Sequence, residues 1–424
     1  MKIHIKNGRL IDPKNGIDAV QDIFIAKGKI VAIGAAPDEF QASRVIDAQS
    51  LIVCPGLVDL SVRLREPGLE YMATLESEMA AAVAGGVTSI ACPPDTDPPL
   101  DEPGLVEMLK HRAKSLNQAH VYPIGALTQG LKGERLTEMA ELNDAGCVVF
   151  GQPDGLLPNL RVLMQAMLYA STFGFSVWLR PQEITLTGDG VAHDGEVATR
   201  LGLLTVPVCA ETIAIGNIVL LTKETGVRVH LCRISSAEGL AMIRSARQQG
   251  LPITCDVSIN HLHLSDMDIG FFDSNCHLMP PLRSSSDRDA LRHGLLDGTI
   301  GAICSDHAPV DEDAKLLPFG QSEVGATGVE LLLPLTLKWG SEMRLPLLNV
   351  LSKITSDPAR ILGIDAGHLS LGSAADICIF DPDHYWKVTS SAILSQGKNT
   401  PFMGMEIPGG VKYTLVNGHI VYEH

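Results

Sequence analysis

The alternation of short apolar strands with helical segments is the sequence feature that most constrains the fold. Over roughly three hundred of the 424 residues, apolar runs such as GVTSIACPP and VRVHLCRIS are separated by segments with helical periodicity. One such segment, AEGLAMIRSARQQG, ends at Gly250 as a helix C-cap would. Repeated βα units predict a parallel sheet, and the (β/α)8 barrel is its commonest single-domain form at this size. We therefore expect an α/β fold with a (β/α)8 barrel over residues 54–362.

The two ends of the chain resemble each other. Residues 3–11 (IHIKNGRLI) and 413–421 (YTLVNGHIV) are alternating strand patterns joined through Asn-Gly. Asn-Gly favours the left-handed turn of a two-residue hairpin, so we expect a hairpin at each end. The simplest explanation of the two similar ends is that residues 1–53 and 363–424 form one small β-sandwich domain, with the barrel inserted between them. A chance pair of Asn-Gly turns is the alternative.

Polar side chains gather where the candidate strands of the barrel end. Because the active sites of such barrels are built at the carboxyl ends of the strands, this edge is the expected functional site. For any single residue a solvated loop is the alternative. The residues in question are Asp95, Gln152, Asp154, Arg180, Arg233, Asp256, Asp306 and His307.

Composition narrows the classes of partner. With 33 basic and 49 acidic residues the chain has a formal net charge of -16, which argues against nucleic acid and anionic membranes. The sequence has no signal-peptide core and no apolar run long enough to span a membrane. Nine cysteines without CxxC spacing are typical of reduced thiols. We expect a cytoplasmic protein.

Several motifs together resemble one enzyme family. In chain order they are PGLVDLSVRLREPG, CPPDTDPPLDEP, CDVSINHLHL, MPPLRSSSDRDAL, CSDHAPV and GHLSLGSAADICIFDP. They are similar to those of bacterial dihydroorotases, members of the cyclic amidohydrolase superfamily, and the resemblance covers essentially the whole chain. It implies an amidohydrolase-type barrel in which histidines at the strand ends bind zinc.

The histidines that serve such enzymes as zinc ligands are replaced in this sequence. The resemblance places the first-strand pair at Ser61 and Arg63, the fifth-strand ligand at Arg180 and the sixth-strand ligand at Arg233. The eighth-strand aspartate is retained as Asp306. A guanidinium stays protonated and offers no lone pair, so it cannot coordinate zinc. We therefore predict no bound zinc, no other cofactor and no catalytic residue.

Substrate-binding positions of the family are altered as well. The acid that bridges two metals falls nearest to Asp154, and a substrate-binding asparagine falls on Asp95, whose carboxylate would repel an anionic substrate. A second asparagine falls on Met279, and the histidine after DHAP falls on Val310. The family arginine is retained as Arg65, which could pair with a carboxylate.

Two alternatives concern the charged residues. Arg65 could simply form an ion pair with Glu66 at the strand end. The three new arginines could point outward into solvent, or they could offset the carboxylates that zinc would otherwise neutralise. We favour the second arrangement, a salt-bridge cluster that replaces the metal, with four carboxylates as its acidic members: Asp59, Asp95, Asp154 and Asp306.

Other groupings could in principle supply a new site. His261 and His263 would share a face of a strand and could bind a relocated metal with Asp256 or Asp306, although we do not favour this. The His230-Leu231-Cys232 segment is interpreted as core. The pair Asp306-His307 suggests a catalytic triad, but adjacent strand residues point to opposite faces.

Two functions follow from these patterns. The first is a non-catalytic protein, because degenerate dihydroorotase chains serve as structural subunits of bacterial aspartate carbamoyltransferase. The resemblance then implies a hetero-oligomer with the catalytic chain of that enzyme, in pyrimidine biosynthesis. The alternative is an active dihydroorotase, or another cyclic amidohydrolase, with remodelled metal ligands.

Overall fold

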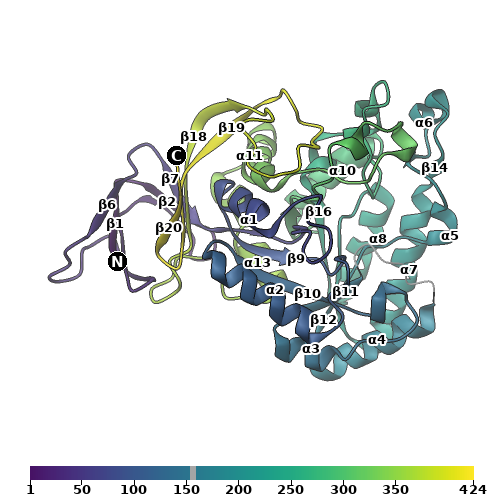
Figure 1. Ribbon diagram of the computed structural model, residues 1–424, viewed down its shortest axis with the longest axis horizontal. Helices are drawn as coiled ribbons and strands as arrows, with labels where there is room; N and C mark the ends of the chain where they lie inside the picture. The colour runs from purple at the N-terminus through teal and green to yellow at the C-terminus, as the bar shows by residue number, and fades with distance from the viewer. Residues whose placement is uncertain (153–158) are drawn as a thin grey trace.

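A computed structural model describes residues 1–152 and 159–424. Eight parallel strands form a nearly closed barrel in chain order, which confirms the expected architecture (Figure 1). The ring closes just beyond the ends of the first and last strands. There the amide of His307 donates to the carbonyl of Ser61, and the amide of Arg63 donates to the carbonyl of His307, each at 3.0 Å. The strands are β8 (Leu57–Asp59), β9 (Val87–Cys92), β10 (His120–Ala126), β11 (Val149–Gln152), β12 (Ser176–Leu179), β15 (Arg228–Leu231), β16 (Ile253–Ser258) and β17 (Ala302–Cys304).

The centre of the barrel is packed with side chains, among them Val58, Ile124, Trp178 and Ala302. It is therefore a core and not a channel, as is usual for this fold. Helices cover the outside of the strands, where their apolar faces complete a second core. The longer helices are α1 (Leu75–Ala84), α2 (Pro103–Leu116), α3 (Met139–Ala145), α4 (Leu160–Phe173), α7 (Val208–Thr225), α8 (Ala237–Gln248), α10 (Ser285–Leu296), α11 (Leu332–Glu342) and α13 (Ser356–Leu362).

Both ends of the chain meet in a small β-domain beside the barrel (Figure 1). A six-stranded sheet has the order β20-β19-β18-β7-β2-β3, and a four-stranded sheet has the order β5-β4-β1-β6. Apolar residues of the two sheets share one buried cluster, which includes Ile5, Ile25, Val53 and Ile379. The strands are β1 (Lys2–Lys6), β2 (Arg9–Asp12), β3 (Ile17–Val20), β4 (Ile23–Ala26), β5 (Lys29–Ile33), β6 (Arg44–Asp47), β7 (Ile52–Pro55), β18 (Ile377–Lys387), β19 (Glu406–Val416) and β20 (His419–Glu423).

One of the two predicted terminal hairpins is wrong. Strands β19 and β20 pair as expected around Asn417-Gly418, with Val416 opposite His419. At the N-terminus, β1 pairs with β4 and β6, whereas β2 pairs with β3 and β7. Asn7 has the left-handed φ of 63° that the motif predicts, but the turn carries the chain from one sheet to the other. The sequence therefore predicted the backbone conformation at Asn7 correctly, but it did not predict which strands pair with β1 and β2.

Among the described residues, the helices are too short or too polar to cross a lipid bilayer.

Candidate functional site

The candidate site lies at the carboxyl ends of the barrel strands. Arg63 follows β8, Arg180 follows β12, Arg233 follows β15 and Asp306 follows β17. The predicted bridging acid, Asp154, lies outside the described residues. A cavity of about 400 Å³ at this end brings seven of the other predicted residues together. Its polar and apolar lining includes Arg63, Arg65, Asp95, Arg180, Arg233, Met279 and Asp306.

Arg63 and Arg233 are buried and point into this cavity. Arg63 donates from Nε to Asp95 Oδ2 at 2.7 Å and from Nη1 to Asp306 Oδ1 at 3.3 Å. Arg233 Nη1 donates to the same Asp306 oxygen at 2.8 Å. The alternative of arginines directed into solvent is therefore wrong for these two residues. They form a network with Asp95 and Asp306, as the salt-bridge interpretation expects.

Arg180 and Ser61 complete the set of replaced positions. Arg180 is half-buried, lines the same cavity and donates from Nη1 to Oε1 of Gln182. Ser61 is buried, and its hydroxyl lies 3.5 Å from Asp306 Oδ1. The three arginines therefore line one cavity that contains Asp306, and the hydroxyl of Ser61 lies beside the same carboxylate.

Three residues of the site have left-handed backbone conformations. The φ angles are 61° at Arg65, 56° at Arg233 and 49° at Asp306. Such angles are uncommon for residues other than glycine, and they cluster at functional sites, where they redirect a side chain. The sequence shows no glycine at these positions that would have signalled the turn.

Asp59 is not paired with the arginines, contrary to the cluster that we predicted. Its Oδ1 atom accepts hydrogen bonds from the amides of Ser61 at 3.2 Å and Ser305 at 3.0 Å. Burial raises the pKa of Asp59 to about 6, because the charged form loses its hydration. Asp59 therefore ties the ends of β8 and β17 together through backbone amides.

The residues at and beside the altered substrate positions have partners within the chain. Arg65 donates from Nε to the carbonyl of Pro309 at 2.9 Å. Glu66 pairs with Arg112 and accepts from the amide of Leu75, so the proposed Arg65–Glu66 ion pair is wrong. Val310 is buried in the same region.

His261 and His263 lie on a short helix, α9 (Ile259–His263), and not on a strand. His261 contacts the hydroxyl of Ser258 and the carbonyl of Pro281, whereas His263 donates to the carbonyl of Leu335 at 2.8 Å. Burial lowers the pKa of His263 to about 4, which keeps it neutral. The two rings are thus used separately as internal hydrogen-bonding groups, and the relocated metal site has no support in this geometry.

His230 and Cys232 are buried in the barrel interior, which confirms the interpretation of this segment as core. Together with Asp256 they place three ligand atoms within 4.8 Å of one another. His230 Nε2 lies 3.0 Å from Asp256 Oδ2, and all three residues are buried. A hydrogen-bonded pair inside the barrel accounts for this arrangement without a metal.

His307 faces away from the cavity, as strand alternation predicts. Its Nδ1 atom accepts from the amides of Gly328 and Val329, so Nε2 carries the proton and donates to Glu78 at 2.7 Å. Glu78 also accepts from the hydroxyl of Ser395 at 2.7 Å. Sequence analysis missed Glu78, because a glutamate in the helical segment LESEMAAAVAGG resembles an exposed helix residue. The structure shows it fully buried.

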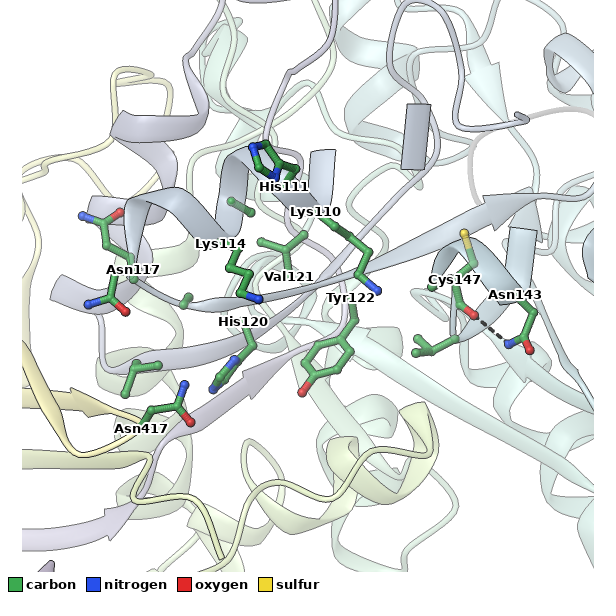
Figure 2. A pocket seen from close by; sticks show the side chains of 16 residues that line it. Lys110, His111, Lys114, Asn117, His120, Val121, Tyr122, Asn143, Cys147 and Asn417 are labelled. Atoms are coloured by element: carbon green, nitrogen blue, oxygen red, sulfur yellow. Dashed lines mark hydrogen bonds between the residues drawn. The ribbon is translucent and has the colours of Figure 1, made fainter. Parts of the chain in front are cut away.

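A second cavity, of about 620 Å³, lies at the opposite end of the barrel strands, beside α2, β10 and the Asn417 turn (Figure 2). Figure 2 shows Lys110 and Lys114 on one helix face above His120 and Tyr122. His120 Nε2 lies 3.0 Å from Asp376 Oδ2, which raises the pKa of the imidazole. None of the strand-end arginines lines this cavity.

The residues of the strand-end site do not fit a zinc ion. Zinc sites are built from imidazole, thiolate and carboxylate ligands. Here the family's imidazole positions hold a serine hydroxyl and three guanidiniums, and Asp306 Oδ1 already accepts from two of those guanidiniums. A divalent cation added to this arrangement would meet positive charge on several sides, so no metal-dependent step is derived for the site.

Comparison with known proteins places the chain in a family. A model of the dihydro-orotase-like family matches residues 50–239, and a model of the amidohydrolase family matches residues 220–422. A dihydroorotase-like protein from Pseudomonas putida is 46% identical over 422 residues, with 100% of this chain and 99% of that protein covered. The chain belongs to the dihydroorotase-like family. The resemblance inferred from the motifs is thereby confirmed.

Other relatives of this dihydroorotase-like chain carry the same name or related names. A dihydroorotase-like protein from Pseudomonas aeruginosa is 44% identical, and a dihydroorotase from Geobacter sp. (strain M21) is 40% identical, each with full coverage of both chains. Among solved structures, an L-hydantoinase (dihydropyrimidinase) from Arthrobacter aurescens has a TM-score of 0.87 at 28% identity. That match covers 99% of this chain and 96% of the hydantoinase.

Proposed function

We propose that this chain is a non-catalytic dihydroorotase-like subunit that supports the assembly and activity of aspartate carbamoyltransferase in pyrimidine biosynthesis. The observation that carries the proposal is the pairing of Asp306 with both Arg63 and Arg233. A carboxylate must hold a metal or accept a proton to contribute to amide hydrolysis, and two guanidiniums oppose both roles. The same cations compensate its charge without a metal.

The partner assignment rests on the family resemblance. The chain aligns with these relatives over its whole length, in the barrel and in the terminal domain, while the positions at which the resemblance expects histidine ligands hold Ser61, Arg63, Arg180 and Arg233. A folded scaffold without a set of metal ligands at its centre would suit a structural subunit. Function belongs to sites and not to folds, so the proposal needs a direct test.

The test is co-expression of the tagged chain with the aspartate carbamoyltransferase catalytic chain of the same genome. We expect the two to purify together, and we expect the carbamoyltransferase activity to fall when this chain is omitted. The matched control is the tagged dihydroorotase-like chain expressed alone. Purification of a fully active carbamoyltransferase free of this chain would contradict the proposal.

A second candidate is a cyclic amidohydrolase with remodelled ligands. Its support is the grouping of His230, Cys232 and Asp256, together with relatives that are named dihydroorotase. Metal analysis of the purified chain and a dihydroorotate turnover assay distinguish the candidates. Stoichiometric zinc with turnover would favour the hydrolase, whereas turnover no faster than the buffer blank favours the structural subunit.

A further inference from the structure

The cavity beside α2 is separate from the strand-end site and has no part in the proposed function. Its wall is formed by the second half of α2, the amino end of β10, the end of α3 and the turn between β19 and β20 (Figure 2). The barrel and the terminal β-domain therefore both contribute to it. Its volume of about 620 Å³ is within the range of cavities that bind small molecules, roughly 300–1,000 Å³.

None of the 16 described residues that line this cavity is acidic, although the whole chain has a net charge of -16. Two of them are lysines, Lys110 and Lys114, which are four residues apart on α2 and so share one face of the helix. Both side chains are exposed, and within the part of the chain that the structure describes neither ammonium group has a hydrogen-bond or ion-pair partner. Two positive charges therefore border the cavity without a carboxylate to neutralise them.

The ends of two helices do not cancel this charge. Asn117 after α2 and Gly146 after α3 both line the cavity, so the carboxyl ends of these helices lie beside it. A helix end carries roughly half a negative charge, whereas each lysine carries a full positive charge. Gly146 also makes room for Lys110, because a Cβ atom at residue 146 would overlap the Nζ atom of Lys110. That ammonium group therefore lies against the cavity wall.

Asp376 contacts two residues of the lining but is already used within the chain. Its Oδ1 atom accepts from the amide of Asn417 at 2.7 Å, and its Oδ2 atom lies 3.0 Å from Nε2 of His120. Both carboxylate oxygens thus have a partner on the cavity wall. Asp376 therefore does not present an uncompensated negative charge to a ligand.

The rest of the wall can accept a flat ring. Val121, Val148 and Val416 supply apolar surface, and the half-buried Tyr122 lies below the two lysines in Figure 2. Aromatic side chains bind planar heterocycles by stacking. Asn417 has an exposed side-chain amide, which can both donate to and accept from the edge of such a ring.

We propose that this cavity binds a nucleoside monophosphate, with the phosphate between Lys110 and Lys114 and the base against Tyr122. A phosphate monoester carries about 1.5 to 2 negative charges at neutral pH, which matches the two ammonium groups. Lysine binds phosphate as a point charge and needs no fixed geometry. A polyanion would also meet the net negative charge of the rest of the chain, so a single small anion fits better. The proposal does not depend on the proposed function, because neither candidate function uses this cavity.

The test is isothermal titration calorimetry of the full-length chain with AMP, GMP, CMP and UMP as probes. We expect at least one to bind with a Kd below about 1 mM, and Lys110→Gln/Lys114→Gln to weaken it at least about tenfold. The matched control is Lys132→Gln/Lys223→Gln, which removes the same two charges from exposed positions outside the cavity. The proposal is overturned if none of the four nucleotides binds at about 1 mM, or if the two double variants bind equally well.

Inorganic phosphate and Tyr122→Leu test the position of the base. Inorganic phosphate should bind at least about tenfold more weakly than the nucleotide, because it makes no contact with the apolar wall. Tyr122→Leu should weaken nucleotide binding at least about threefold and leave phosphate binding unchanged. If phosphate bound as tightly as the nucleotide, or if Tyr122→Leu had no effect, the cavity would be a general anion site and the proposal would fail.

Discussion

Arg233 Nη1 lies 2.8 Å from Asp306 Oδ1, and both side chains are buried at the carboxyl end of the barrel. Arg63 follows β8, the strand beside which β17 closes the ring, and its Nη1 atom lies 3.3 Å from the same oxygen. Asp306 therefore lies beside the guanidinium groups of two arginines of the same chain. This arrangement compensates buried charge within the chain, so we expect the stability of the site to depend on the two arginines.

Removing the charge of Asp306 should destabilise the fold. Asp306→Asn keeps the size of the side chain, and asparagine tolerates the left-handed φ of 49° at this position. The variant leaves two buried guanidiniums without their shared carboxylate, which costs about 3–5 kcal/mol in comparable buried pairs. Chemical denaturation of both proteins at neutral pH measures the difference.

The control for this prediction is a surface ion pair. Asp289 lies 3.0 Å from Arg288 and is 58% exposed, so Asp289→Asn should change the free energy of unfolding by less than about 0.5 kcal/mol. If Asp306→Asn were as mild as Asp289→Asn, the arginine network would not be holding the barrel mouth together.

Restoring histidines at the four replaced positions should make stability depend on zinc. Removing Arg63, Arg180 and Arg233 leaves Asp95 and Asp306 without their cations, and four imidazoles then supply lone pairs. We expect added zinc to raise the Tm of the variant with histidine at 61, 63, 180 and 233, and EDTA to reverse the increase. The wild-type Tm should respond to neither.

The control for the histidine variant replaces Arg63, Arg180 and Arg233 with methionine. Methionine removes the same positive charges without supplying an imidazole. This protein should be destabilised like the histidine variant in EDTA, but zinc should not rescue it. Rescue of the methionine variant by zinc would show that the metal acts elsewhere in the chain.

The βα alternation predicted the barrel and the edge that carries the site, and the family motifs predicted residues that meet there. This succeeded because strand order in a (β/α)8 barrel is fixed by chain order, so residues at strand ends converge. Asp59 was misplaced because its backbone partners, Ser61 and Ser305, depend on how the first and last strands close the ring. The alternative Arg65–Glu66 ion pair was wrong because Arg112 approaches Glu66 from α2, a packing contact that no local pattern encodes.

Glu78 should stabilise the chain more at neutral pH than in acid. Burial alone would raise its pKa, but hydrogen bonds from His307 and Ser395 lower the pKa below its ordinary value. A lowered carboxyl pKa contributes stability that is present above the unfolded pKa of about 4.3 and is lost as the pH falls through the folded pKa. Glu78→Gln should therefore cost about 2 kcal/mol at pH 7 and progressively less toward pH 4.

Thermal unfolding of Glu78→Gln and the wild-type chain across that pH range measures the gap in Tm. The exposed Glu76 on the same helix is the matched control, and Glu76→Gln should show a small gap that varies little with pH. A gap for Glu78→Gln that widened toward acid would contradict the role assigned to the ionised carboxylate.

The His120–Asp376 pair should stabilise the chain more in mild acid than in base. The hydrogen bond that His120 donates to Asp376 raises the pKa of His120 above its unfolded value of about 6.5. A raised histidine pKa contributes stability that is fully present below pH 6.5 and is lost as the pH rises through the folded pKa. His120→Gln can still donate to Asp376 but does not titrate. The Tm of His120→Gln should therefore fall further below the wild-type Tm at pH 5.5 than at pH 8.5. The control is His111→Gln, at an exposed position of the same cavity, which should leave the dependence of Tm on pH unchanged. A constant gap for His120→Gln would show that the imidazole is neutral in this pair.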